Sequence, residues 1–219
     1  MQSGYQDISK YCAEHGVALL AVSKTKTPVE ILAVYNQGHR IFGENKVQEL
    51  VSKYEALPKD IQWHLIGHLQ TNKVKFVVPF VSMIQSVDSW KLLKEIDKEA
   101  KKKNRNVSVL LQIHIATEET KFGLSYAEAE EIFSNPELKD LTGITISGLM
   151  GMASLTEDEQ QIRNEFRGLK NFFERYRQLQ GSNIKLQTLS MGMSSDYKLA
   201  IEEGSNMVRI GSAIFGERK

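Results

Sequence analysis

The chain has 219 residues, a formal net charge of +1, 25% charged residues and a single cysteine, Cys12. A chain of this length can bury one large core, and no glycine-, serine- or proline-rich linker divides it, so we expect one domain over residues 1–219. The balanced charge gives no reason to expect nucleic acid as a partner, and one cysteine excludes both an internal disulfide and a metal site built from several cysteines.

Short β-branched runs alternate with helical patterns along the whole chain and predict eight strands. The predicted strands are, in chain order, residues 17–22, 39–43, 62–67, 82–87, 107–115, 144–150, 186–192 and 206–211. Several are apolar on both faces, as strands of a parallel sheet covered by helices must be. Eight such strands with a helix in each gap predict an α/β fold, a (β/α)₈ or TIM barrel. A doubly wound open sheet is the alternative, but no GxGxxG pattern follows the first strand.

The predicted helices carry their own start signals. Three residue pairs match the capping box, in which a Ser or Thr is followed three residues later by Glu. They are Thr27 with Glu30, Ser125 with Glu128, and Thr156 with Glu159. Asp88 and Asp196 stand where the N-caps of two further helices are expected, because their carboxylates can accept hydrogen bonds from free helix N–H groups.

The turns after the seventh and eighth predicted strands both place serine shortly after glycine. They read MGMSSD at residues 191–196 and RIGS at residues 209–212. Backbone N–H groups and hydroxyls in such turns can converge on an anion, and TIM barrels commonly hold phosphate in these two loops. A tight turn is the simpler interpretation for one such loop, whereas two neighbouring loops favour a phosphate site.

Lys24 ends an apolar run and follows the first predicted strand after one residue, Ser23. Side-chain alternation decides whether it points into the barrel, where burial would favour the neutral amine that attacks an aldehyde carbonyl. The alternative is a lysine that reaches out to solvent. A phosphate-bearing aldehyde would need both the lysine and the phosphate turns, so we favour a Schiff-base lysine. We interpret Lys26, in the following loop, as a solvated lysine.

Arg209 lies inside the last apolar strand, and a buried guanidinium needs acceptors. Its partner is either a carboxylate, such as Glu202 or Glu217, or a heteroaromatic nitrogen, which an arginine would leave unprotonated. Asn45 either binds a cofactor hydroxyl or caps a helix that starts at Lys46. No group of potential ligands has metal-binding spacing, so we predict no metal site.

Seven motifs, taken together and in order, make the chain resemble the pyridoxal 5′-phosphate (PLP) homeostasis protein family, whose fold is related to the N-terminal barrel of alanine racemase. The motifs are AVSKTK (21–26), FGEN..QE (42–49), WHLIGHLQTNK (63–73), SVDS (86–89), ISGLMGM (146–152), LSMGMSSD (189–196) and VRIGSAIFG (208–216). The resemblance implies that Lys24 forms an internal aldimine with PLP and that Arg209 faces the pyridine nitrogen. It also implies that Ser194, Gly211 and Ser212 hold the phosphate and that Asn45 and Lys121 neighbour the ring.

The resemblance implies a protein of vitamin B6 homeostasis that holds PLP without robust catalysis and passes it to apo-enzymes. A weak amino-acid racemase and a Schiff-base aldolase for a sugar phosphate are the alternatives. Alanine racemase takes its second proton donor from a C-terminal β-domain that has no counterpart in this sequence, so we expect weak racemase activity at most. Arg209 has no obvious role in an aldolase. We expect a cytoplasmic monomer with no membrane partner.

Overall fold

The computed structural model describes residues 2–118, 122–179, 181 and 183–216. Eight parallel strands pair in chain order and close into a barrel when β8 pairs with β1. The strands are β1 Ala18–Val22, β2 Ile41–Glu44, β3 Gln62–Leu65, β4 Met83–Val87, β5 Val107–Ile113, β6 Ile144–Gly151, β7 Ile184–Ser190 and β8 Met207–Ile210. Every predicted strand is present, so the predicted TIM barrel is confirmed and the doubly wound sheet is excluded.

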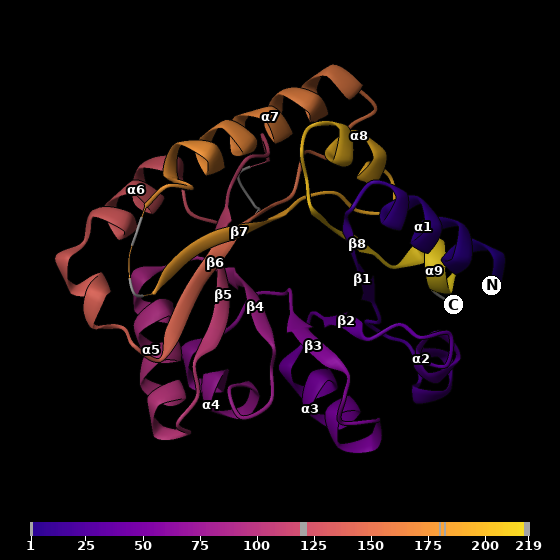
Figure 1. Cartoon of the computed structure of the whole chain (residues 1–219), viewed down its shortest axis with the longest axis horizontal. Helices are drawn as coiled ribbons and strands as arrows, with labels where there is room; N and C mark the ends of the chain where they lie inside the picture. Colours follow the sequence, from indigo (N-terminus) through magenta and orange to yellow (C-terminus); the bar gives the residue numbers. More distant parts are fainter. Residues whose placement is uncertain (1, 119–121, 180, 182, 217–219) are drawn as a thin grey trace.

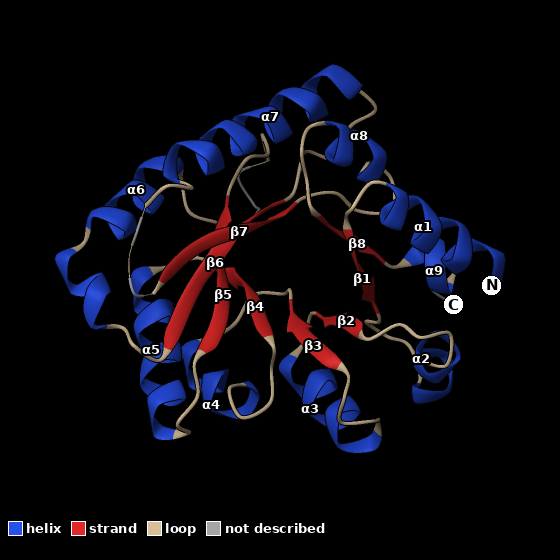
Figure 2. Cartoon of the chain, viewed as in Figure 1, coloured by secondary structure: helices blue, strands red, loops and turns tan. Residues whose placement is uncertain are grey.

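Helices follow every strand and cover the outside of the barrel (Figures 1 and 2). They are α1 Gln2–Glu14, α2 Pro28–Tyr35, α3 Val47–Ala56, α4 Val74–Val77, α5 Trp90–Lys102, α6 Tyr126–Ser134, α7 Glu159–Tyr176, α8 Tyr197–Glu202 and α9 Ser212–Phe215, with 3-10 turns at Thr71–Lys73 and Pro136–Asp140. Helix α1 packs beside α9 (Figure 1). Within the described residues, no helix is both long and apolar enough to cross a membrane.

The apolar core has two layers because successive side chains of a strand point to opposite faces. Trp63 and Phe42 are fully buried in the layer between the strands and the helices. Leu20 and Val22 belong to a separate cluster that includes Met207 from β8 and lies on the inner side of the barrel wall. Apolar side chains therefore pack the interior beside β1 and β8.

Two of the three predicted capping boxes are confirmed, at Thr27 with Glu30 and at Ser125 with Glu128, where both reciprocal hydrogen bonds are present. The box at Thr156 is wrong. Asp158 is the N-cap of α7 instead, and its carboxylate accepts from two helix N–H groups.

The prediction that Asp88 caps α5 is also wrong. The neighbouring Ser89 is the N-cap and accepts from Leu92 N. The carboxylate of Asp88 is turned toward His68 Nδ1, 2.8 Å away. That contact to the loop after β3 explains why the serine, rather than the aspartate, caps the helix.

Candidate functional site

A cavity of about 360 Å³ lies at the carboxyl ends of the strands, the face on which TIM barrels place their chemistry. Its walls come mainly from the residues that end or follow β1, β2, β3, β6, β7 and β8. They are Val22, Lys24, Thr25, Lys26, Asn45, Ile66, Met152, Met193, Ser194, Ser195, Arg209, Gly211, Ser212 and Gly216. Among these described residues three are cationic and none is acidic, so the cavity favours an anionic ligand of small-molecule size.

The predicted site residues Lys24, Asn45, Ser194, Arg209, Gly211 and Ser212 all line this one cavity. The role of each toward a ligand stays a prediction, and Lys121 lies outside the described residues. Asn45 does not cap a helix at Lys46, because α3 begins at Val47 and its N-cap is Lys46 itself. Asn45 is half-buried in the cavity wall instead.

Strand alternation directs Lys24 toward the cavity. Val22 and Lys24 both line it, whereas the intervening Ser23 is fully buried and bonds to Glu44 on the helix side of the barrel. The lysine is half-buried. It therefore lies where an amine can meet a ligand that enters from the mouth of the barrel.

The interpretation of Lys26 as a solvated lysine is wrong. Its side chain is only 13% exposed, its Nζ donates to Phe215 O over 3.1 Å, and Glu30 Oε1 lies 3.6 Å from the same nitrogen. The loop after β1 folds against the end of α9, and the carbonyls there take the place of solvent.

The turn after β7 requires Gly192, which has φ +91°, in the left-handed region that favours glycine. A Cβ at this position would lie 2.6 Å from Ala200 Cβ. Asp196 is the N-cap residue of α8, as predicted, but its side chain does not make the expected hydrogen bond to the helix. Its Oδ1 accepts from Met193 N over 2.6 Å and holds this turn closed.

The turn after β8 lies against the turn after β7. Ser194 Oγ accepts from Gly211 N over 3.3 Å, so two of the predicted phosphate donors already face each other. A Cβ on Gly211 would lie 3.1 Å from Val22 O, which shows how closely this turn approaches β1. The N–H and hydroxyl groups of the two loops are therefore close enough to serve one anion.

Arg209 is 4% exposed, and its acceptors are not carboxylates. Nη1 donates to Ser190 O over 2.8 Å and to Ser190 Oγ over 2.7 Å, and Nη2 donates to Gly151 O over 2.9 Å. Glu202 is occupied elsewhere, with Arg163 Nη2 at 2.6 Å, and Glu217 lies outside the described residues. Burial lowers the pKa of Arg209 to about 10, with Asp196 opposing the shift, so the guanidinium stays charged at neutral pH.

A chain of side-chain hydrogen bonds runs from Arg209 across the inside of the barrel. Because arginine can only donate, the Ser190 hydroxyl accepts from it and donates onward to Gln85 Oε1 over 2.7 Å. The Gln85 amide nitrogen lies 2.9 Å from His64 Nδ1, which must accept and is therefore unprotonated. Burial lowers the pKa of His64 to about 4, in agreement with a neutral ring. His64 is thus a buried core histidine with a satisfied Nδ1.

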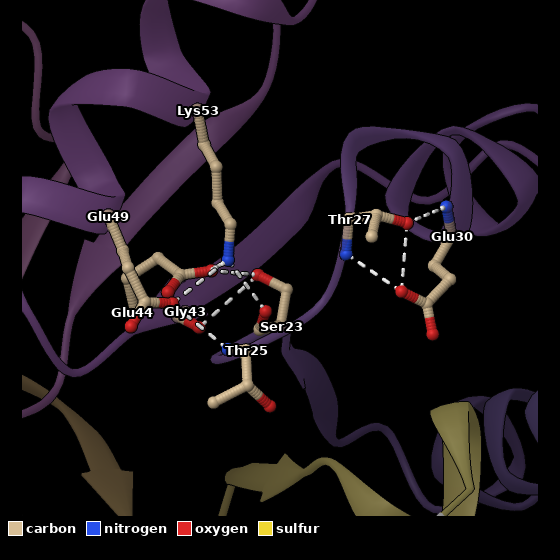
Figure 3. A network of polar contacts seen from close by, with 8 residues as sticks. All are labelled: Ser23, Thr25, Thr27, Glu30, Gly43, Glu44, Glu49 and Lys53. Atoms are coloured by element: carbon tan, nitrogen blue, oxygen red, sulfur yellow. Dashed lines mark hydrogen bonds and ion pairs between the residues drawn. The ribbon is translucent and has the colours of Figure 1, made fainter. Parts of the chain in front are cut away.

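Sequence reasoning missed a buried ionic cluster behind Lys24 (Figure 3). Lys53 from α3 lies within hydrogen-bond distance of Ser23 O, Glu44 Oε1 and Glu49 Oε2, at 2.8, 2.8 and 3.3 Å. Burial raises the pKa of Glu44, against the opposing effects of Lys53 and Ser23. The sequence signals for this cluster were the two glutamates of the FGEN..QE motif, Glu44 and Glu49, and the spacing of Glu49 and Lys53, one helical turn apart.

The chain matches the family described as alanine racemase, N-terminal domain, over residues 1–219. The pyridoxal phosphate homeostasis protein of Aquifex aeolicus (strain VF5) is 42% identical over 219 residues, covering 97% of this chain and 94% of that protein. PipY of Synechococcus elongatus PCC7942, solved with PLP bound, is 36% identical with a TM-score of 0.82 over 92% of this chain and 93% of its own. Alanine racemase from Bartonella henselae, with covalently bound PLP, shares the fold at 17% identity and a TM-score of 0.73; the match covers 99% of this chain and 60% of the racemase.

Proposed function

We propose that this chain, which belongs to the alanine racemase N-terminal domain family and within it to the pyridoxal phosphate homeostasis proteins, binds PLP in the cavity at the carboxyl ends of its strands. The observation that carries the proposal is the convergence of Lys24, Arg209 and the Gly–Ser turns on one cavity of about 360 Å³. It combines an amine, a phosphate-binding pair of turns and a fixed cation, which match the aldehyde, the phosphate and the ring nitrogen of PLP. Its role in the cell is PLP homeostasis, the function for which its relatives are named.

The donor set of the cavity fits PLP. Ser194, Ser212 and the Gly211 N–H are the groups for the phosphate, and Arg209 is the group for the ring nitrogen. Lys24 supplies the amine for the aldehyde, and Asn45 lies in the same wall, where it can bind a ring substituent. PLP supplies an aldehyde that condenses with amines and a ring that withdraws electrons from the resulting bond.

Arg209 favours the binding of PLP over catalysis by PLP. A guanidinium with a pKa of about 10 keeps its proton at neutral pH. It can donate a hydrogen bond to an unprotonated ring nitrogen, and it has no acceptor for the N–H of a protonated one. An unprotonated ring nitrogen is a poorer electron sink. The contacts of Arg209 with Ser190 and Gly151 fix the guanidinium, so this restriction is built into the barrel wall.

The recipients of PLP are part of the proposal. A homeostasis protein must release its ligand, and we propose that apo forms of PLP-dependent enzymes receive it from a cytoplasmic monomer of this chain. The alternatives are less favoured. An aldolase for a sugar phosphate has no use for a buried arginine beside its Schiff-base lysine, and a racemase would be slowed by the same arginine.

The test is a visible absorption spectrum of the purified protein, followed by borohydride reduction and peptide mass mapping. A yellow protein with reduced pyridoxyl phosphate on Lys24 is the expected result. Lys24→Ala should lose the visible band and the adduct, whereas Lys26→Ala, a change to the second lysine of the cavity, should keep both. A wild-type protein that stays colourless and unmodified after PLP is added would overturn the proposal.

A further inference from the structure

The peptide groups on both sides of Lys24 are held by side chains that lie outside the cavity. On the N-terminal side, Ser23 O accepts from Lys53 Nζ over 2.8 Å, and Ser23 Oγ donates to Glu44 Oε1 over 2.5 Å. On the C-terminal side, Thr25 N donates to Glu49 Oε2 over 2.9 Å. Figure 3 shows these contacts converging on the turn between β1 and α2.

Lys53 contacts the groups that hold both peptide groups beside Lys24. It is 7% exposed, and its ammonium contacts both carboxylates, Glu44 Oε1 at 2.8 Å and Glu49 Oε2 at 3.3 Å. Three of its N–H bonds therefore have acceptors, which is what a buried ammonium needs. The three charged groups, Glu44, Glu49 and Lys53, form what we call the α3 clamp.

The α3 clamp holds a backbone shape that the chain would otherwise avoid. Thr25 has φ +65°, in the left-handed region, although it is β-branched. For a β-branched residue this conformation is an outlier, and it persists only where the surrounding structure imposes it. The bond from Thr25 N to Glu49 lies at this residue, next to Lys24 in the chain.

The clamp is not part of the cavity wall. Glu44, Glu49 and Lys53 do not line the cavity within the described residues, whereas Lys24 and Thr25 do. Glu44 is fully buried, and its Oε2 has no hydrogen-bond partner in the described part of the chain. A buried ionic cluster with an unsatisfied oxygen contributes little to the stability of the fold. Its placement beside the turn that carries Lys24 therefore calls for a functional reason.

We infer that the α3 clamp positions Lys24, so that its amine meets the ligand aldehyde in a reactive orientation. The inference rests on the proposed PLP binding and assigns Glu44, Glu49 and Lys53 as positioning residues for it. In the step they serve, the Lys24 ammonium first releases one proton to solvent. The aldehyde C=O bond then breaks as a C=N bond forms to Lys24 Nζ, and the carbonyl oxygen leaves with the two amine hydrogens as one water. Misplacing a reacting group by about 1 Å can slow a step by about a hundredfold.

The experiment separates non-covalent binding of the ring and phosphate in the cavity from covalent attachment to Lys24. PLP is first stripped with hydroxylamine, and binding of pyridoxamine 5′-phosphate, which keeps the ring and phosphate but has no aldehyde, is measured by calorimetry. Attachment is then followed by adding PLP, quenching samples with borohydride at timed intervals, and quantifying the modified Lys24 peptide. Lys53→Met should slow attachment by about tenfold or more and leave pyridoxamine 5′-phosphate affinity within about twofold of wild type. Lys53→Arg, which keeps a cation, should restore much of the rate.

The chain offers a matched control on the opposite end of the barrel. Lys101 on α5 also contacts a buried carboxylate one turn earlier, Asp97 Oδ2 at 2.8 Å, and a backbone carbonyl, Asp140 O at 2.8 Å. The Lys101 side chain is more exposed than that of Lys53, 43% against 8%. Lys101→Met should lose its carboxylate and carbonyl contacts without slowing attachment. If Lys53→Met fails to fold because Glu44 is left alone, Glu49→Ala releases Thr25 N with less buried charge and should slow attachment in the same direction.

The outcomes distinguish the two proposals. A wild-type protein without a Lys24 adduct refutes PLP binding itself. A wild-type adduct together with equal attachment rates in Lys53→Met, or in Glu49→Ala if that is the folded variant, and in Lys101→Met refutes the positioning role alone. An equal loss of pyridoxamine 5′-phosphate affinity and attachment rate also refutes it, because the clamp would then support the whole cavity rather than Lys24.

Discussion

Acidification should unfold this protein partly through His64, the residue that ends the hydrogen-bond chain from Arg209. Burial lowers the pKa of His64 from 6.5 to about 4 in the folded chain. Between these values the unfolded chain binds a proton that the folded chain does not, so stability rises with pH across this window and is lost as pH falls through it. At about 1.36 kcal/mol per pKa unit, the full loss is about 3 kcal/mol, of which about 2 kcal/mol is already lost at pH 5.

The assay is urea unfolding at pH 7 and pH 5 for the wild type and for His64→Gln. The glutamine carbonyl can still accept from Gln85 but does not titrate, so the variant should lose about 2 kcal/mol less than the wild type between the two pH values. The contributions of carboxylates that titrate in both proteins cancel when the two pH dependences are subtracted. The same pH dependence in both proteins would contradict the assignment of a neutral, buried His64.

Three further changes test the site. Arg209→Lys loses the two-pronged contact with Ser190 and Gly151 and should cost about 3 kcal/mol in urea unfolding; a loss below about 1 kcal/mol would show that the guanidinium is not tightly held. Gly192→Ala brings a Cβ within 2.6 Å of Ala200 Cβ and should cost about 2 kcal/mol or more, beyond Gly16→Ala, where the added Cβ has open space; equal losses would remove the steric argument. Ser190→Ala should lower the free energy of unfolding by about 2 kcal/mol. The loss should be smaller in a Gln85→Leu background, because the Gln85 Oε1 atom that Ser190 would leave without a donor is absent there. Additive losses in this double-mutant cycle would contradict the hydrogen-bond chain.

The barrel could be predicted from the sequence because its signals are local. Each strand is a short apolar run, and the Thr27–Glu30 and Ser125–Glu128 boxes each join two residues within one helical turn. Errors arose where neighbouring residues compete for one position. Asp88 and Ser89 can both cap α5, and the choice depends on His68, which lies 20 residues away in the chain and cannot be placed from local patterns.

The candidate site was predictable where side chains follow strands and unpredictable where backbone atoms are the partners. Lys24, Ser194 and Ser212 lie at strand ends that a barrel must bring together. Arg209 was expected to pair with either a carboxylate or a heteroaromatic nitrogen. Its acceptors within the described residues include the carbonyls of Ser190 and Gly151, the second of them 58 residues away. Every residue carries a carbonyl, so sequence alone gives no way to select these two.

The α3 clamp illustrates how one strand can serve both sides of the barrel wall. Because side chains alternate, the strand that turns Lys24 toward the cavity must turn Ser23 toward α3. Glu44, at the end of the neighbouring strand, and Lys53, on the helix that follows it, meet Ser23 there. A reactive lysine that follows β1 therefore has a buried residue, Ser23, directly before it in the chain. Charged residues that contact Ser23 can set the position of the lysine without entering the cavity.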